Sequence, residues 1–196
     1  MKRICVFCGS NLGVDKIFAE QAYLLGKTLA QKNIGLVYGG ANIGLMGKVA
    51  NAALEYHGEV IGVMPYFMKD KELAHKQLTR LEVVDTMQER KAKMYELSDG
   101  AMALPGGFGT LDELFELLTW GQLGLHRKPV AILNTEGYYN HLLSFTQTMA
   151  DKGFLNEASK SMLLVHDDID TLLDQMSNYK APEVVMWPKH ENLNVS

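Results

Sequence analysis

Residues 105–113 read PGGFGTLDE, and their types suit the binding of an anion beside a carboxylate that could do chemistry. Glycine lets backbone N–H groups approach a ligand closely, and a helix N-terminus adds unpaired donors and a partial positive charge. Phosphate is the natural ligand for such a loop. Glu113 lies one helical turn further on, within reach of a sugar attached to that phosphate. Glu113 is therefore a candidate catalytic residue.

The same residues also fit a purely structural role. Thr110 and Glu113 form the T-x-x-E pattern of a capping box, in which two side chains satisfy backbone donors at the first turn of a helix. A tight turn between a strand and a helix also favours glycine. A helix cap and a ligand site are both compatible with this stretch alone.

Arg90 is the candidate partner of Glu113. It lies in TMQERKAKMYEL, residues 86–97, and Lys91 follows it on the same side of the predicted helix. That side is marked by three apolar residues at spacings of seven and three: Met87, Met94 and Leu97. An arginine among core-facing positions must find an anion, because burying it unpaired is costly. A structural salt bridge would satisfy it, but we favour a ligand phosphate or Glu113 as the partner.

Two further glycine-rich loops follow predicted strands, CGSNLG at 8–13 and YGGANIGLMG at 38–47. In parallel α/β sheets the ligand binds outside the carboxyl ends of the strands, so loops that follow strands meet at one edge. Three glycine loops at that edge favour a phosphorylated ligand over turn geometry alone. The candidate ligand contacts in the second loop are Gly39, Gly40 and Gly44.

Missing fingerprints narrow the class of ligand. No loop reads G-x-G-x-x-G after the first strand, and the second strand ends in Tyr38 and Gly39 rather than in an acid that could hold a ribose hydroxyl. The P-loop pattern G-x-x-x-x-G-K-[ST] is absent too, since GLMGK at 44–48 continues into valine. A dinucleotide-dependent oxidoreductase and a P-loop ATPase are therefore disfavoured.

The cysteines and histidines do not suggest a metal site. Cys5 and Cys8 lie three apart in the apolar run RICVFCG, so their side chains would point to opposite faces of a strand. This favours two reduced core thiols over a redox or zinc pair. The six histidines are scattered, without a metal-binding spacing. We predict no metal and no cofactor.

Charge and hydropathy argue against two classes of partner. The formal net charge is −4, and Lys and Arg are spread along the chain, which argues against nucleic acid. No apolar run reaches the length that spans a bilayer, and MKRICVFCGS at the N-terminus has too short an apolar core for a signal peptide. We expect no membrane partner and a cytoplasmic location.

The elements that must position these residues alternate along the whole chain, as βαβ units do. Strands are expected near 2–8, 34–38, 59–64, 81–85, 100–104, 129–133 and 162–165. Helices are expected near 15–32, 44–57, 87–98, 110–123, 137–151 and 168–177, with a helical turn near 67–75. We predict a doubly wound, Rossmann-like α/β fold with a parallel sheet of about seven strands and helices on both faces. Residues 1–180 would form a single nucleotide-binding domain, and residues 181–196, with two prolines and no clear periodicity, a C-terminal extension.

Three stretches together resemble a known family. PGGFGTLDE resembles the P-G-G-x-G-T-x-x-E signature of the LONELY GUY (LOG) family of cytokinin riboside 5′-monophosphate phosphoribohydrolases, and MQERKAKM resembles its E-R-K motif. YGGANIGLMG is similar to the family's second loop, with Ala41 in place of the third glycine. The resemblance covers about residues 3–178.

The resemblance implies hydrolysis of the N-glycosidic bond of a purine nucleoside 5′-monophosphate, which releases the free base and ribose 5-phosphate. It places the catalytic pair on Arg90 and Glu113, and it implies a homodimer. It also implies a set of substrate-binding positions: Ser10, Glu72, Met87, Lys91, Gly106, Gly107, Phe108, Gly109, Thr110, Leu111, Asp112 and Thr119.

The sequence leaves two questions open: which base is preferred, and whether the protein hydrolyses its ligand or only binds and carries it. Members of the family act on N6-prenylated adenosine monophosphates or on AMP, and Met64, Met94 and Leu123 would line a prenyl pocket or, as we favour, belong to the core. Proteins of similar fold carry molybdenum cofactor without hydrolysing it, although a carrier has no chemical need for Arg90 and Glu113. An older family label, lysine decarboxylase, implies a lysine bound to pyridoxal phosphate, and no lysine here stands out for that role.

Overall fold

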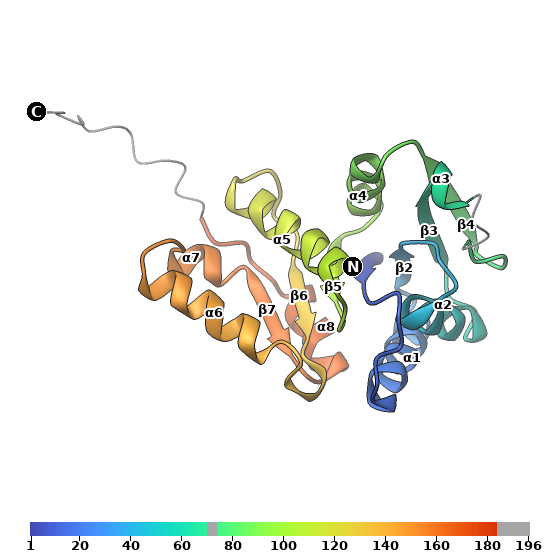
Figure 1. Cartoon of the computed structure of the whole chain (residues 1–196), viewed down its shortest axis with the longest axis horizontal. Helices are drawn as coiled ribbons and strands as arrows, with labels where there is room; N and C mark the ends of the chain where they lie inside the picture. The colour runs from blue at the N-terminus through green and yellow to red at the C-terminus, as the bar shows by residue number, and fades with distance from the viewer. Residues whose placement is uncertain (70–73, 184–196) are drawn as a thin grey trace, which may run out of the picture.

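The computed structural model describes residues 1–69 and 74–183, which form one parallel sheet of seven strands in the order β4-β3-β2-β1-β5-β6-β7 (Figure 1). The strands are β1 Arg3–Phe7, β2 Gly35–Tyr38, β3 Val60–Pro65, β4 Arg80–Val84, β5 Gly100–Ala103, β6 Val130–Leu133 and β7 Leu163–His166. The helices are α1 Lys16–Gln31, α2 Gly44–Glu55, α3 Tyr66–Lys69, α4 Met87–Glu96, α5 Phe108–Gln122, α6 Asn140–Asp151, α7 Glu157–Lys160 and α8 Ile169–Ser177, with a 3-10 turn at Thr135–Gly137. The predicted α/β fold with seven parallel strands is confirmed.

Helices cover both faces of the sheet, because successive side chains on the buried strands point to opposite sides. On β1, Ile4 and Val6 belong to a core that also contains apolar residues of α1, α2 and α8. Cys5 and Phe7 belong to a second core, which contains residues of α4 and α5. The fold is therefore doubly wound.

The two cysteines behave as the strand pattern predicts. Cys5 and Cys8 are free, buried thiols that lie in different cores. Within residues 1–69 and 74–183, no group of three or more histidine, cysteine or acidic side chains is placed to hold a metal ion. No helix in the same ranges is long and apolar enough to cross a membrane.

The topology opens a crevice beside β1. The chain runs outward from β1 through β2, β3 and β4 on one side and through β5, β6 and β7 on the other. Where the direction of winding changes, the loops after β1 and β5 lie next to each other: the Gly9 amide donates to the Pro105 carbonyl over 3.0 Å. Ligands bind at such a switch point, beyond the carboxyl ends of the strands.

Several element boundaries differ from those predicted. Helix α5 begins at Phe108 rather than at residue 110, and the segment before α6 forms a separate 3-10 turn, so α6 itself begins at Asn140. The helical turn expected near 67–75 ends at Lys69 in the described part of the chain, since Ala74 instead forms a β-bridge with Ala41. Glu72 lies outside the described residues, as does the predicted C-terminal extension from residue 184 onward.

Candidate active site

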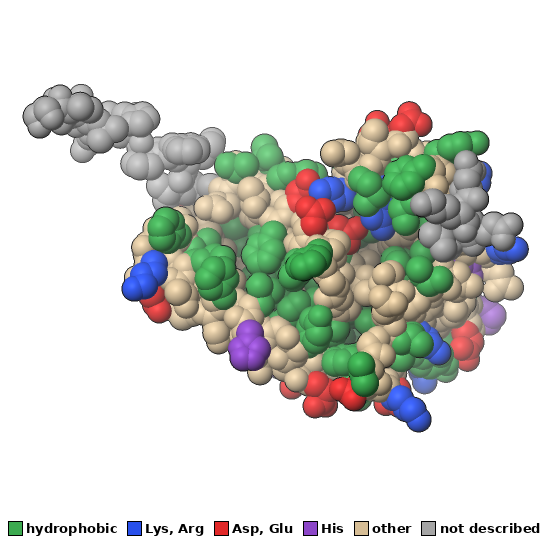
Figure 2. All heavy atoms as spheres, viewed as in Figure 1, with side chains coloured by type: hydrophobic (Ala, Val, Ile, Leu, Met, Phe, Trp, Pro, Cys, Tyr) green, Lys and Arg blue, Asp and Glu red, His purple; other side chains and the backbone are tan. Residues whose placement is uncertain are grey.

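A pocket of about 270 Å³ lies at the carboxyl edge of the sheet, where the loops after β1, β2 and β5 meet. Each of these loops contributes a glycine to the lining, namely Gly9, Gly39 and Gly107. Figure 2 shows basic and acidic side chains meeting in the hollow between α4 and α5. The prediction that three glycine-rich loops gather at one edge is therefore confirmed.

An ion pair between Arg90 of α4 and Glu113 of α5 forms one wall of this pocket. Arg90 Nη1 donates to Glu113 Oε1 over 3.0 Å. The two residues expose only 8% and 9% of their surfaces, so the pair is largely removed from bulk water. Helical spacing had placed Arg90 on the buried side of its helix, and the structure supplies Glu113 as its anion.

The guanidinium of Arg90 is fixed from two further directions. Its Nε donates to the carbonyl of Val63, at the end of β3, over 3.1 Å. On another side it packs so closely on Gly39 that a Cβ at that position would overlap Arg90 Nη2. The absence of a side chain at Gly39 thus leaves room for the guanidinium, a role that the sequence did not reveal.

Glu113 is tuned by its surroundings. Burial raises the pKa of its carboxyl above the ordinary value of 4.5, against the opposing effect of the nearby Arg90 guanidinium. Its second carboxylate oxygen, Oε2, forms no hydrogen bond with any residue that the structure describes. A carboxylate with a raised pKa and one oxygen left for a ligand is suited to accept a proton.

The N-terminus of α5 is open, and the capping box, one of the two alternatives that the sequence allowed, does not form. The N-cap is Gly107, which offers no side chain, and Thr110 lies inside the first turn. Glu113 instead accepts from Arg90, so its side chain does not serve the helix start. Phe108 is 94% exposed and a Cβ at Gly107 or Gly109 would meet no atom within 4 Å, so this turn is open to solvent. Such an N-terminus can bind an anion.

Helix α4, which carries Arg90, does have a side-chain N-cap. Thr86 is the N-cap of α4, and its Oγ1 accepts from the amide of Glu89 over 3.1 Å. The Glu89 carboxylate in turn accepts from the amide of Asp85. This cap fixes the first turn of the helix that carries Arg90.

Lys91 lies beside the ion pair rather than in the pocket. Its Nζ lies 3.0 Å from Asp112 Oδ2 and 3.1 Å from Glu116 Oε1, both on α5. Burial opposes the charge on Lys91, but hydrogen bonds to the two carboxylates outweigh it and leave its pKa raised. Lys91 and Asp112, expected to bind substrate, are thus engaged with one another.

The second glycine loop packs against the first. Gly44 has a φ of +56°, and a Cβ there would overlap the backbone of Ser10. Gly40, with a φ of +79°, accepts from the amide of His75 through its carbonyl. These two glycines shape the pocket without lining it, whereas Ser10 lines it directly.

A second pocket of about 250 Å³ adjoins the first and shares Gly9, Ser10 and Gly107 with it. It contains Gly106, whose carbonyl accepts from the hydroxyl of Tyr138 over 2.7 Å. Tyr138 follows the 3-10 turn after β6, so its placement depends on loops distant in sequence. The sequence interpretation missed it, and the only available signal was that its loop also follows a strand.

Three expected substrate contacts lie elsewhere in the described structure. Thr119 lines a different pocket, formed with residues of α6 and α7, and its hydroxyl donates to the Phe115 carbonyl. Met87 is 36% exposed and Leu111 packs at the second core, and neither lines the pocket with Arg90 and Glu113. Of the candidate prenyl contacts, Met64 and Met94 are buried, and Met94 also lines the pocket with Arg90 and Glu113. The core assignment favoured for Leu123 is wrong, because its side chain is 47% exposed at the end of α5.

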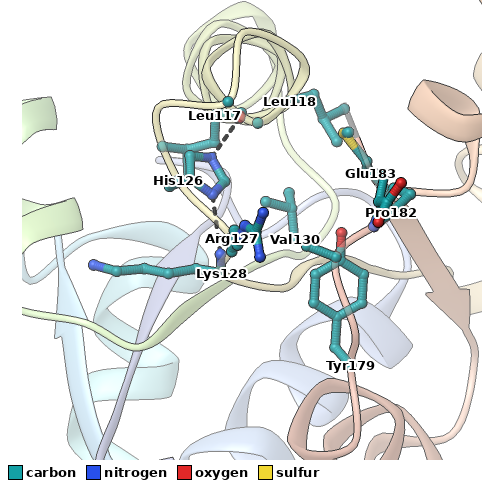
Figure 3. Close-up of a pocket in the computed structure, with 13 residues that line it drawn as sticks. Leu117, Leu118, His126, Arg127, Lys128, Val130, Tyr179, Pro182 and Glu183 are labelled. Atoms are coloured by element: carbon teal, nitrogen blue, oxygen red, sulfur yellow. Dashed lines mark hydrogen bonds between the residues drawn. The ribbon is translucent and has the colours of Figure 1, made fainter. Parts of the chain in front are cut away.

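Another pocket, of about 330 Å³, is larger but remote from Arg90 and Glu113. It lies near the amino end of β6, between the end of α5 and the chain after α8 (Figure 3). His126 in its wall is tied to the Leu117 carbonyl over 2.8 Å. Volume alone therefore does not identify the site, whereas the buried ion pair and the glycine loops do.

Comparison with known proteins gives consistent matches. The family described as "Possible lysine decarboxylase" matches residues 46–176. The probable cytokinin riboside 5′-monophosphate phosphoribohydrolase LOGL2 of Oryza sativa subsp. japonica is 41% identical over 192 residues, covering 98% of this chain and 76% of that protein. The cytokinin riboside 5′-monophosphate phosphoribohydrolase LOG1 of Arabidopsis thaliana is also 41% identical over 192 residues, covering 98% of this chain and 87% of that protein.

Solved structures support the fold. The molybdenum cofactor binding protein of Rippkaea orientalis aligns with a TM-score of 0.68 and 22% identity, covering 90% of this chain and 96% of that one. The molybdenum cofactor carrier protein of Chlamydomonas reinhardtii aligns with a TM-score of 0.68 and 20% identity, covering 90% and 98%. At this level of identity the likeness concerns architecture only.

Proposed function

The chain belongs to the LONELY GUY family of cytokinin riboside 5′-monophosphate phosphoribohydrolases, and from this membership we propose that it hydrolyses the N-glycosidic bond of a purine nucleoside 5′-monophosphate. The products are the free base and ribose 5-phosphate. The observation that carries the proposal is the buried pair of Arg90 and Glu113 in the wall of a glycine-lined pocket.

Glu113 acts as the general base in this reaction. Its free oxygen takes a proton from water, the water oxygen bonds to the anomeric carbon, and the bond from that carbon to the base nitrogen breaks. The electron pair leaves with the base, which is then protonated. Positive charge develops on the sugar as the bond breaks, and a carboxylate beside the anomeric carbon stabilises it.

The 5′-phosphate binds at the open first turn of α5. No side chain caps this turn, the space beside Gly107 and Gly109 is open, and the unpaired amides of a helix N-terminus favour an anion. Binding energy from the phosphate orients the sugar against Glu113, so a group that does not react contributes to the rate. Arg90 holds Glu113 in place and, because it lines the same pocket, can also contact substrate oxygens.

Lysine decarboxylation does not fit the residues of this pocket. That reaction requires pyridoxal phosphate held as a Schiff base by a lysine. No lysine is among the described residues that line the pocket, and Lys91, beside it, is held by Asp112 and Glu116.

The test is chromatographic detection of free base after incubation with AMP and, separately, with isopentenyladenosine monophosphate. Wild type should release base, and Glu113→Gln should lower kcat by roughly 10²–10⁴-fold. The matched control is Glu82→Gln, which removes a carboxylate that pairs with Arg80 on the edge strand β4, and it should match wild type. Nucleotide binding without cleavage by wild type would contradict hydrolysis and favour a carrier, and the faster substrate identifies the preferred base.

A homodimer is the assembly that we propose. Hydrophobic side chains gather on the face formed by α5, α6 and α7 (Figure 2). A pocket of about 240 Å³ on this face includes Thr119 and Phe154, and Phe154 is 87% exposed. Exposed apolar patches of this kind mark interaction surfaces. Light scattering should give twice the mass of the chain, and Phe154→Asp should shift it towards the monomer.

We also assign the protein to the cytoplasm. Cys5 and Cys8 are buried free thiols, which a reducing compartment preserves. Fractionation of cells that produce the tagged chain should recover it with cytoplasmic markers, and recovery from the extracellular medium would contradict the assignment.

A further inference from the structure

Neighbouring loops hold the backbone of the loop between β5 and α5. The Pro105 carbonyl accepts from the amide of Gly9, which follows β1, over 3.0 Å. The next carbonyl, that of Gly106, accepts from the hydroxyl of Tyr138, which follows β6, over 2.7 Å. The loop that leads into the proposed phosphate site is therefore fixed from both of its neighbours in the sheet.

The bond from Tyr138 also fixes the direction of one amide. A trans peptide unit is planar, and its carbonyl and N–H point in opposite directions. The described residues contain no cis peptide bond, so the Gly107 N–H points away from the hydroxyl that holds the Gly106 carbonyl. Gly107 lines both pockets at this edge, whereas Tyr138 lines only the pocket of about 250 Å³.

The Gly107 amide has no partner among the residues that the structure describes. The Gly107 carbonyl accepts from the amide of Leu111 in α5, but the Gly107 N–H donates to none of these residues. No side chain caps the helix, and a Cβ at Gly107 would meet no atom within 4 Å. An unpaired N–H at an open helix N-terminus can donate to a phosphate oxygen.

The turn that carries Tyr138 is held from several directions. Glu136 has a φ of +53°, a strained conformation that persists only where the surrounding structure enforces it. The Asn134 side chain accepts from the amide of Tyr139 over 2.8 Å. The ring of Tyr138 packs edge-on against that of Phe18 on α1, with centroids 5.8 Å apart. The hydroxyl is thus presented to the loop by a fixed ring.

We propose that Tyr138 is a positioning residue for phosphate binding: its hydroxyl holds the Gly106 carbonyl, and this turns the Gly107 N–H towards the 5′-phosphate of the substrate. This role rests on the proposed function, which places a nucleoside 5′-monophosphate at this loop. The hydroxyl does not itself donate to the phosphate, because its only proton is given to the Gly106 carbonyl.

Tyr139 provides a matched comparison. Its hydroxyl donates to the Leu104 carbonyl over 2.7 Å, so it holds the same stretch of chain. The peptide unit after Leu104 contains the nitrogen of Pro105, which carries no N–H. Loss of the Tyr139 bond therefore releases no amide donor, whereas loss of the Tyr138 bond releases the Gly107 amide.

The first experiment is calorimetric titration of the full-length chain with ribose 5-phosphate. Tyr138→Phe keeps the ring and removes the hydroxyl, and the Kd for ribose 5-phosphate should rise about 3–10-fold, as for the loss of one hydrogen bond. The kcat/KM for AMP should fall by the same factor. The Kd for adenine, which lacks the phosphate, should stay within about twofold of wild type.

Two variants serve as controls. Tyr139→Phe should lower the melting temperature but leave the Kd for ribose 5-phosphate within about twofold of wild type. Tyr23→Phe removes a hydroxyl that donates to Glu55 between α1 and α2, and it should match wild type in binding and activity. An unchanged Kd in Tyr138→Phe, or an equal rise in Tyr138→Phe and Tyr139→Phe, would overturn the proposal.

Nuclear magnetic resonance tests the amide itself. Saturating ribose 5-phosphate should shift the Gly107 amide proton signal of wild type, because a hydrogen bond to the phosphate forms. The shift should be smaller in Tyr138→Phe at saturation. A Gly107 signal that does not move in wild type, or that moves equally in the variant, would overturn the role of Tyr138.

Failure of this role and failure of the proposed function give different results. If wild type binds ribose 5-phosphate but releases no base from any nucleotide, hydrolysis fails, and the role of Tyr138 is decided by the calorimetry and the Gly107 signal. If wild type cleaves AMP and Tyr138→Phe binds ribose 5-phosphate equally well, the hydrolase assignment stands and the role of Tyr138 fails. Absence of ribose 5-phosphate binding by wild type would overturn both the phosphate site and the role of Tyr138.

Discussion

Gly39→Ala should disable the site while leaving the fold intact. A Cβ at residue 39 would overlap Arg90 Nη2 and would approach the sulfur of Met46 at 3.2 Å. Both are ends of flexible side chains, so they can move without displacing the backbone. The guanidinium must shift by roughly 1 Å to restore ordinary van der Waals separation.

The size of the effect follows from what this shift breaks. Arg90 holds the Val63 carbonyl at 3.1 Å and Glu113 Oε1 at 3.0 Å, and a shift of about 1 Å takes such contacts beyond hydrogen-bonding distance. Misplacing a catalytic group by that amount costs about 10²-fold in rate, or roughly 3 kcal/mol in the barrier. The free energy of unfolding should fall by about 1–3 kcal/mol, from the weakened bonds to a charged group.

The assay is kcat/KM for base release, measured together with the melting temperature. The matched control is Gly121→Ala on α5, where a Cβ would make an ordinary contact of 3.4 Å with His126. The control should keep wild-type activity. If Gly39→Ala stays within about threefold of wild-type kcat/KM, then the position of the Arg90 guanidinium does not set the rate, and the reasoning is refuted.

Four further predictions concern the surroundings of the site. Base release should decline as the pH falls through the raised pKa of Glu113, because the base must be ionised, and a pH–rate profile should place that acidic limb above pH 4.5. Folded Glu113 holds its proton more tightly than the unfolded chain does, so its contribution to stability is fully present below pH 4.5 and is lost as pH rises through the raised pKa. In urea titrations, the free energy of unfolding of Glu113→Gln should therefore increase relative to that of wild type as pH rises. A difference that does not change with pH would contradict the raised pKa. Lys128→Met should lower the free energy of unfolding by about 1–3 kcal/mol in urea titrations, because Lys128 Nζ donates to the carbonyls of Tyr95 and Ser98 near the end of α4. Thr86→Ala removes the N-cap of α4 and should cost about 1 kcal/mol by the same measurement, whereas no loss would argue against the cap.

The architecture could be predicted because its signals are local. Short apolar runs alternate with helical patterns, and β1, β2, β3, β5 and β6 are buried strands of the kind that parallel sheets require. The start of α5 was misjudged because glycine is a weak N-cap signal and the T-x-x-E pattern two residues later is a strong one. The T-x-x-E pattern fits a helix cap, but it carries no information about Arg90 on α4, which forms an ion pair with Glu113 in the structure.

The site was predictable where a single helix carried the information. Helical spacing placed Arg90 among buried positions, and the need of a buried cation for an anion led to Glu113. The roles of Gly39 and Tyr138 depend on how loops that are distant in sequence meet at the edge of the sheet. The partners of Lys91 could not be predicted for a similar reason. Helical spacing gives the side of the helix on which a cation lies, but not whether it contacts a ligand or a second helix.

The burial of Glu113 beside Arg90 can be explained by comparing its interaction with the sugar in the ground state and in the transition state. Burial raises the pKa of Glu113, so its charge is only partly compensated by Arg90 in the folded protein. A neutral ribose in the ground state gains little from that charge. In the proposed reaction the sugar becomes positive as the glycosidic bond breaks, and the same carboxylate would stabilise it strongly, in surroundings with little screening by water. The interaction is therefore stronger in the transition state than in the ground state, which is the condition for it to raise kcat rather than only tighten binding.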